Sequence, residues 1–97
     1  MKAIFIVYNQ AYNQEIVQLL EGFGQRGYTV WEEVGGRGSL SGEPHLGSHA
    51  WPAQNHALLS VVEDSLVPEI MRSLRETDAA GPALGLRAYV LPVEEAL

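Results

Sequence analysis

Short apolar segments of strand length alternate along the chain with two amphipathic segments of helix length. The first, residues 2–8, is β-branched and aromatic, and is apolar at both odd and even positions. This pattern is typical of a central strand that is covered on both faces. Residues 56–63 repeat it, and residues 28–34 and 86–91 are predicted to be the other two strands.

Helical spacing follows the first strand, with apolar residues at i, i+3, i+4 and i+7. These residues are Ile16, Leu19, Leu20 and Phe23. Asn13 is predicted to be the N-cap, because its short side chain can accept a bond from a free backbone N–H. Gly24 or Gly27 is predicted to end the helix.

A second helix is predicted after the third strand, with Asp64 or Ser65 as its cap and Pro68 in its first turn. Its buried stripe comprises Leu66, Val67, Ile70, Met71 and Leu74. Residues 77–85 are predicted to form a short loop, because they contain Gly and Pro.

The order β-α-β-loop-β-α-β predicts an α+β, ferredoxin-like βαββαβ sandwich. In this fold a four-stranded antiparallel sheet has both helices on one face. In the strand over residues 28–34, Val30 and Val34 are expected on one face and Trp31 on the other. Two strands are apolar on both sides, and an uncovered apolar sheet face marks an interface. The pattern therefore predicts a homo-oligomer.

We expect a single domain over residues 1–97, with a long loop at about 35–55. This stretch holds all three histidines if His56 at its boundary is included, and it is rich in Gly and Pro. A loop of about 20 residues in a compact domain usually has a function. We therefore expect the binding groups to lie here.

Composition excludes several classes of function. The net charge is −6 with only six Lys and Arg, which argues against a nucleic-acid binder. There is no Cys, so thiol catalysis and thiolate metal sites are excluded. The apolar run near the N-terminus is too short for a signal peptide or a membrane span, and a cytoplasmic protein is expected.

His45 and His49 lie four residues apart in the loop, and Glu43 or Glu33 adds a carboxylate. Imidazole with carboxylate suits Zn, Cu(II), Ni or Co. We therefore hypothesise that the loop binds a divalent transition metal and that binding orders it. The alternative is that these histidines are simply solvated, and His56 is expected to be structural.

Two further features of the loop suggest other ligands. Gly35, Gly36, Arg37 and Gly38 can form a backbone nest for an anion, or simply let the chain turn. Trp51 next to Pro can anchor a partner protein, or fold back over the base of the loop. No nucleophile–base pair is evident from the spacing, so an enzyme is not expected.

The last strand and tail read YVLPVEEAL, residues 61–67 read VVEDSLV, and residues 34–38 read VGGRG. With the order of elements, these segments resemble the nitrogen regulatory protein P-II superfamily, and trimeric CutA-type proteins share the architecture. The resemblance implies a homotrimer that acts as a signalling protein through its large T-loop. Its partner would be another protein, such as a membrane transporter or a regulator.

The chain departs from that family where nucleotide is bound. P-II proteins that bind ATP have Gly-Asp-Gly-Lys before the last strand, whereas residues 80–87 here read AGPALGLR. Arg87 is the only cation in that run, so tight ATP binding is not expected. The alternative to a metal sensor is an adenine-nucleotide or anion sensor, with the glycines and Arg37 of one subunit facing Arg87 of a neighbour. A ligand-free interaction module is the third possibility.

Overall fold

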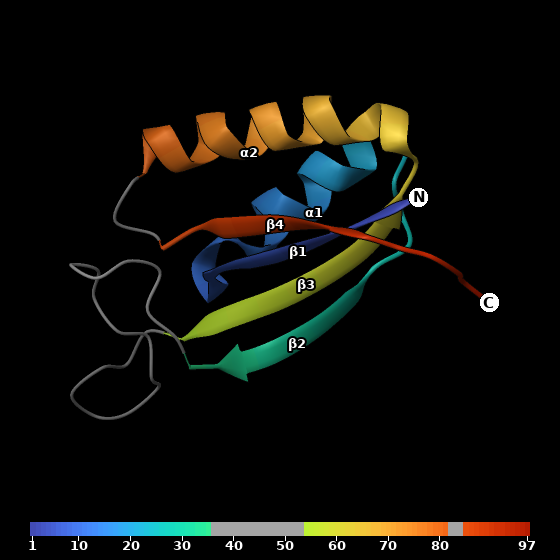
Figure 1. The fold of residues 1–97 in the computed structure, drawn as a ribbon. Coiled ribbons are helices and arrows are strands. Elements are labelled where there is room, and N and C mark those ends of the chain that lie inside the picture. The colour runs from blue at the N-terminus through green and yellow to red at the C-terminus, as the bar shows by residue number, and fades with distance from the viewer. Residues whose placement is uncertain (36–53, 82–84) are drawn as a thin grey trace.

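The computed structural model describes residues 1–35, 54–81 and 85–97. Its strands and helices follow the predicted order (Figure 1). They are β1 (Lys2–Asn9), α1 (Asn13–Gly22), β2 (Thr29–Val34), β3 (Asn55–Val62), α2 (Val67–Ala80) and β4 (Arg87–Pro92). Single 3-10 turns precede the helices, η1 (Gln10–Tyr12) before α1 and η2 (Asp64–Leu66) before α2.

The four strands form one antiparallel sheet in the order β2-β3-β1-β4. Both helices lie on the same face of this sheet (Figure 1). The ferredoxin-like α+β prediction is therefore confirmed.

The core lies between the sheet and the two helices. Ile4 and Ile6 of β1 are fully buried there, and Ile6 is opposite Leu58 of β3. The other core residues come mainly from the helix stripes: Tyr8, Ile16, Leu20, Val62, Ile70, Leu74 and Leu86. Both stripes predicted from helical spacing thus face the sheet.

The N-terminal end of α1 differs from the prediction, whereas its C-terminal end agrees with it. Asn13 is the first helical residue rather than the cap, and its Oδ1 accepts a 2.5 Å bond from the Tyr8 hydroxyl. Asn9 instead caps η1 by accepting a bond from the Ala11 N–H. At the other end Gly24 has φ +78°, and the N–H groups of residues 24 and 25 donate to the carbonyls of residues 21 and 20. This is a Schellman motif, in which glycine takes the left-handed position.

The predictions for the ends of α2 were wrong in two respects. Neither Asp64 nor Ser65 caps it, because η2 intervenes and the N-cap, Leu66, makes no side-chain bond. The Asp64 carboxylate instead lies 2.8 Å from the N-terminal amine of Met1, and this bond lowers the pKa of Asp64. Residues 77–80, predicted as loop, continue the helix up to Gly81.

A β-bulge in β2 changes which residues share a face. Trp31 pairs with Ala57, but Val34 pairs with Asn55, so one extra residue lies between the two pairs. Glu33 has φ 57°, the left-handed conformation that a bulge commonly uses. Val34 is therefore on the face of Trp31, and its predicted place beside Val30 was wrong.

Candidate functional site

The connections that the sequence predicts to be functional lie at one end of the sheet. We call this end the loop end. β2 finishes there at Val34, and β3 and β4 begin there (Figure 1). Residues 36–53 join β2 to β3, and residues 82–84 lie between α2 and β4. The Gln10 N–H donates to the Gln54 carbonyl at 2.8 Å, which fixes the start of β3 to the end of β1.

The β2 side of the loop end is apolar on the sheet face that has no helices. A shallow hollow of about 410 Å³ lies there. Its lining consists of Phe5, Val7, Trp31, Val34, Gly35 and Ala57. The Phe5 and Trp31 rings meet edge-on with centroids 6.4 Å apart. The bulge is what adds Val34 to this hollow.

On the helix side of the same strands, His56 lies opposite the bulge. Its ring meets Tyr8 edge-on at 5.9 Å, and burial raises the pKa of Tyr8 to about 12. Nδ1 of His56 is buried and has no hydrogen-bond partner in the described part of the chain. The bulge residues Glu32 and Glu33 face solvent opposite this histidine. The His56 ring is thus packed against Tyr8 of the core.

The β4 side of the loop end is basic. Arg87, the first residue of β4, lines a cleft of about 240 Å³ together with Arg75 and Asp78 of α2. The Arg87 Nη1 donates to the Leu86 carbonyl at 2.7 Å, which holds the half-buried side chain at the edge of the sheet. A guanidinium has five N–H donors, so this bond leaves most of them for an anion.

The two sides of the loop end lie at opposite edges of the sheet. Arg87 pairs with Val7, Val7 with Ala57, and Ala57 with Trp31, so three strand steps separate Arg87 from β2. At about 4.8 Å per step this is roughly 14 Å. Gly35 and Arg87 of one chain therefore do not meet at a single phosphate-sized site.

Most residues of the predicted sites lie outside the described residues. These are His45, His49, Glu43, Gly36, Arg37, Gly38 and Trp51. Glu33, Gly35 and Arg87 are described, and Glu33 is exposed on the bulge. Among the described residues, no group of three or more His, Asp or Glu is arranged to hold a metal ion. The metal hypothesis thus remains a prediction from sequence alone.

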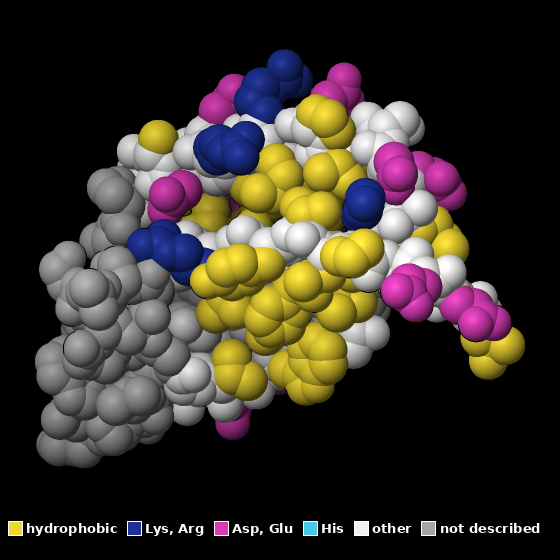
Figure 2. Space-filling model, viewed as in Figure 1, with side chains coloured by type: hydrophobic (Ala, Val, Ile, Leu, Met, Phe, Trp, Pro, Cys, Tyr) yellow, Lys and Arg dark blue, Asp and Glu magenta, His cyan; other side chains and the backbone are white. Residues whose placement is uncertain are grey.

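The sheet face opposite the helices is a continuous apolar surface (Figure 2). We call it the open face. Its most exposed large side chains are Trp31, Tyr89 and Leu91, at 47%, 54% and 47% exposure. Phe5 and Leu59 lie between them on the central strands, where they are partly buried. The face without helices is thus as apolar as the sequence predicted.

No helix among the described residues is long and apolar enough to cross a bilayer. No curated protein matches this chain.

Several solved structures resemble the chain. A PII-like signalling protein from Thermus thermophilus is 27% identical, with a TM-score of 0.65 over 92% of this chain and 82% of that one. The apo form of CPII, a nitrogen regulatory PII-like protein from Thiomonas intermedia, is 17% identical, with a TM-score of 0.70 over 92% and 84%. CPII with ADP, AMP and bicarbonate gives a TM-score of 0.73 at 18% identity, over 99% and 94%.

The family model described as nitrogen regulatory protein P-II matches residues 1–97. This match extends over every strand and helix of the fold, including the bulged strand and the basic edge strand. The chain therefore belongs to the nitrogen regulatory protein P-II family.

Proposed function

We propose that this P-II regulatory protein is a homotrimer that senses an adenine nucleotide, together with a small anion, at the boundaries between its subunits. The observation that carries the proposal is the pair of arginines, Arg75 and Arg87, that line one cleft at the loop end. Asp78 offsets part of their charge, which leaves an excess of one positive charge in the cleft. Such a cleft suits a phosphate or a bicarbonate ion.

The open face supports the oligomer. Exposed aromatic and aliphatic side chains on two strands are costly to leave in water, and a second subunit can cover them. The helices occupy the other side of the sheet, so covering the open face does not disturb them (Figure 1).

The separation of the two sheet edges supports a ligand shared between subunits. The β2 and β4 edges of one sheet are three strand steps, or about 14 Å, apart, and Gly35 follows β2 at the far edge from Arg87. In a closed ring of subunits, the β2 edge of one chain can approach the β4 edge of the next. The glycine-rich exit of β2 would then supply backbone N–H groups, and Arg87 of the neighbour the charge.

Related structures favour the same class of ligand. CPII is described with ADP, AMP and bicarbonate bound. This finding weakens the expectation against tight nucleotide binding, although the Gly-Asp-Gly-Lys run is missing. Arg87, three residues after Leu84, is the cation that this chain offers in its place.

The test is calorimetric titration of the purified protein with AMP, ADP, ATP and bicarbonate, singly and in pairs. Arg87→Ala is expected to weaken binding by roughly 10- to 100-fold, since a hydrogen bond to a charged group contributes about 1.5–3 kcal/mol. Arg72→Ala is the matched control, because Arg72 is an exposed α2 arginine that does not line the cleft. Failure of all four ligands to bind, or equal losses in the two variants, would contradict the proposal.

A further inference from the structure

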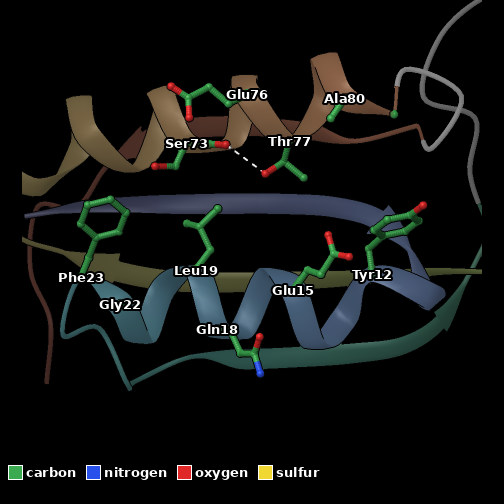
Figure 3. Close-up of a pocket in the computed structure, with 11 residues that line it drawn as sticks. Tyr12, Glu15, Gln18, Leu19, Gly22, Phe23, Ser73, Glu76, Thr77 and Ala80 are labelled. Carbon is green, nitrogen blue, oxygen red and sulfur yellow. Dashed lines mark hydrogen bonds between the residues drawn. The ribbon is translucent and has the colours of Figure 1, made fainter.

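A groove of about 700 Å³ lies between α1 and α2, on the side of the molecule away from the open face (Figures 1 and 3). Residues from the whole length of α1 and the second half of α2 line it. They are Tyr12, Glu15, Gln18, Leu19, Gly22, Phe23, Ser73, Glu76, Thr77, Ala80 and Gly81. We call it the helix groove.

The helix groove has an apolar floor. Tyr12, Leu19 and Phe23 of the α1 side are partly buried against the core and still line the groove. Across from them, Thr77 turns its hydroxyl toward its own helix, where it donates to the Ser73 carbonyl at 3.0 Å (Figure 3). The Thr77 methyl group is therefore left to face a ligand, and the floor can accept apolar side chains.

The walls of the helix groove are acidic. Glu15 lies on one wall and Glu76 on the other, both exposed, and neither forms an ion pair with a described residue. Among the described residues that line the groove there is no Lys or Arg. An apolar floor between two carboxylates complements a segment that is apolar on one side and cationic at its borders.

We propose that the helix groove binds a short cationic amphipathic helix of a partner protein. From Ser73 to Gly81 the groove follows about 12 Å of α2, since a helix rises about 1.5 Å per residue. Two turns of a docked helix match this length, with apolar anchors at i, i+4 and i+7. Lys or Arg side chains beside the anchors would reach Glu15 and Glu76.

This surface is independent of the nucleotide proposal. The groove and the open face lie on opposite sides of the sheet, so a subunit whose open face is covered still presents its groove to solvent. Failure of nucleotide binding therefore leaves this proposal standing, and the reverse also holds.

The probe is a fluorescein-labelled peptide of about 14 residues, in which Leu and Lys are spaced for an amphipathic helix. Fluorescence anisotropy measures its binding to the wild type and to Glu15→Lys/Glu76→Lys, which is expected to bind at least about tenfold more weakly. Glu69→Lys/Glu21→Lys is the matched control. It makes the same change in net charge and, like the test variant, removes one glutamate from the first turn of a helix. Neither Glu69 nor Glu21 lines the groove. It is expected to bind the peptide within about twofold of the wild type.

The decisive comparison exchanges the charges of the peptide and the groove. A second peptide with Glu in place of each Lys is expected to bind Glu15→Lys/Glu76→Lys and to bind neither the wild type nor the control variant. Circular dichroism establishes that both variants are folded. Amide chemical shifts should move for Leu19, Phe23 and Thr77 when the cationic peptide is added.

Three outcomes would overturn the proposal. Equal losses in both double variants would mean that the peptide is attracted by the net charge alone. Shifts confined to the open face would place the peptide there instead. The third outcome is that the peptide does not bind, and that the protein self-associates in a way that Glu15→Lys/Glu76→Lys abolishes. The helix groove would then bind a second copy of this chain.

Discussion

Replacement of the two most exposed rings of the open face should dissociate the oligomer without unfolding the subunit. The change is Trp31→Thr with Tyr89→Thr, which keeps a β-branched residue in each strand. In the isolated subunit these side chains are 47% and 54% exposed, so about half of each already lies in water. The cost of the change therefore falls mainly on the interface.

The magnitude follows from that exposed half. An aromatic side chain has about 150–250 Å² to bury, so each ring offers roughly 100 Å² to a neighbour. At about 25 cal/mol per Å² this is about 2.5 kcal/mol, or about 2 kcal/mol after allowing for the threonine that replaces it. Two rings then contribute about 4 kcal/mol per subunit, which is roughly a 1,000-fold change in the association constant for each subunit that joins the trimer.

Sedimentation velocity over a range of concentrations measures the effect, and far-ultraviolet circular dichroism checks the fold. The wild type should sediment as a trimer, and the double variant as a folded monomer. Tyr28→Thr is the control, because Tyr28 is 41% exposed but precedes β2 and does not belong to the open face. A double variant that stays trimeric, or a wild type that is monomeric at every concentration, would refute the argument.

Four further variants each test a single feature of the chain. Gly24→Ala should lower the free energy of unfolding by about 1 kcal/mol in urea denaturation, because Gly24 has φ +78°. Gly22→Ala in the last turn of α1 should raise it by a few tenths of a kcal/mol up to about 1, since no atom lies within 4 Å of the added methyl; the same sign for both would contradict this. Asp64→Asn should be less stable than the wild type at neutral pH. The folded-state pKa of Asp64 is depressed, so the difference should be present above the ordinary value of 3.8 and vanish as the pH falls through the lowered pKa; a difference that persists in strong acid would exclude this cause. In the metal hypothesis, His45→Ala/His49→Ala abolishes uptake of Zn, Cu or Ni by stripped protein in native mass spectrometry, and unchanged uptake would remove the hypothesis.

The sequence predicted those parts of the fold in which one local pattern dominates. β1 and β3 are apolar on both faces because one face meets the helices and the other forms the open face. The bulge at Glu33 was not predicted, because one extra residue hardly changes the composition by which a strand is recognised in the sequence. Two successive glutamates before Val34 were the available signal, since they interrupt the alternation of apolar and polar residues.

The candidate sites were harder to predict, because they depend on spacing between elements. Nothing local indicates that Arg75 and Arg87 share a cleft, since one belongs to α2 and the other to β4. The helix groove depends on the distance between two helices packed on one sheet, which the apolar stripes do not determine. Thr77 and Ala80 line it, and residues 77–80 were assigned to a loop because Gly81 and Pro82 follow closely.

The second half of α2 lines both proposed binding sites. Arg75 and Asp78 face the cleft at β4, whereas Glu76 and Thr77 face the helix groove. A small rotation or shift of α2 on binding at one site would therefore alter the other. Thermodynamic linkage makes this measurable: any factor by which AMP changes the affinity for the cationic peptide must equal the factor by which the peptide changes the affinity for AMP. If the two factors equal one, α2 acts as a rigid wall, and the sites report to their partners separately. If they differ from one by the same amount, α2 connects the nucleotide signal to the outer surface of the subunit.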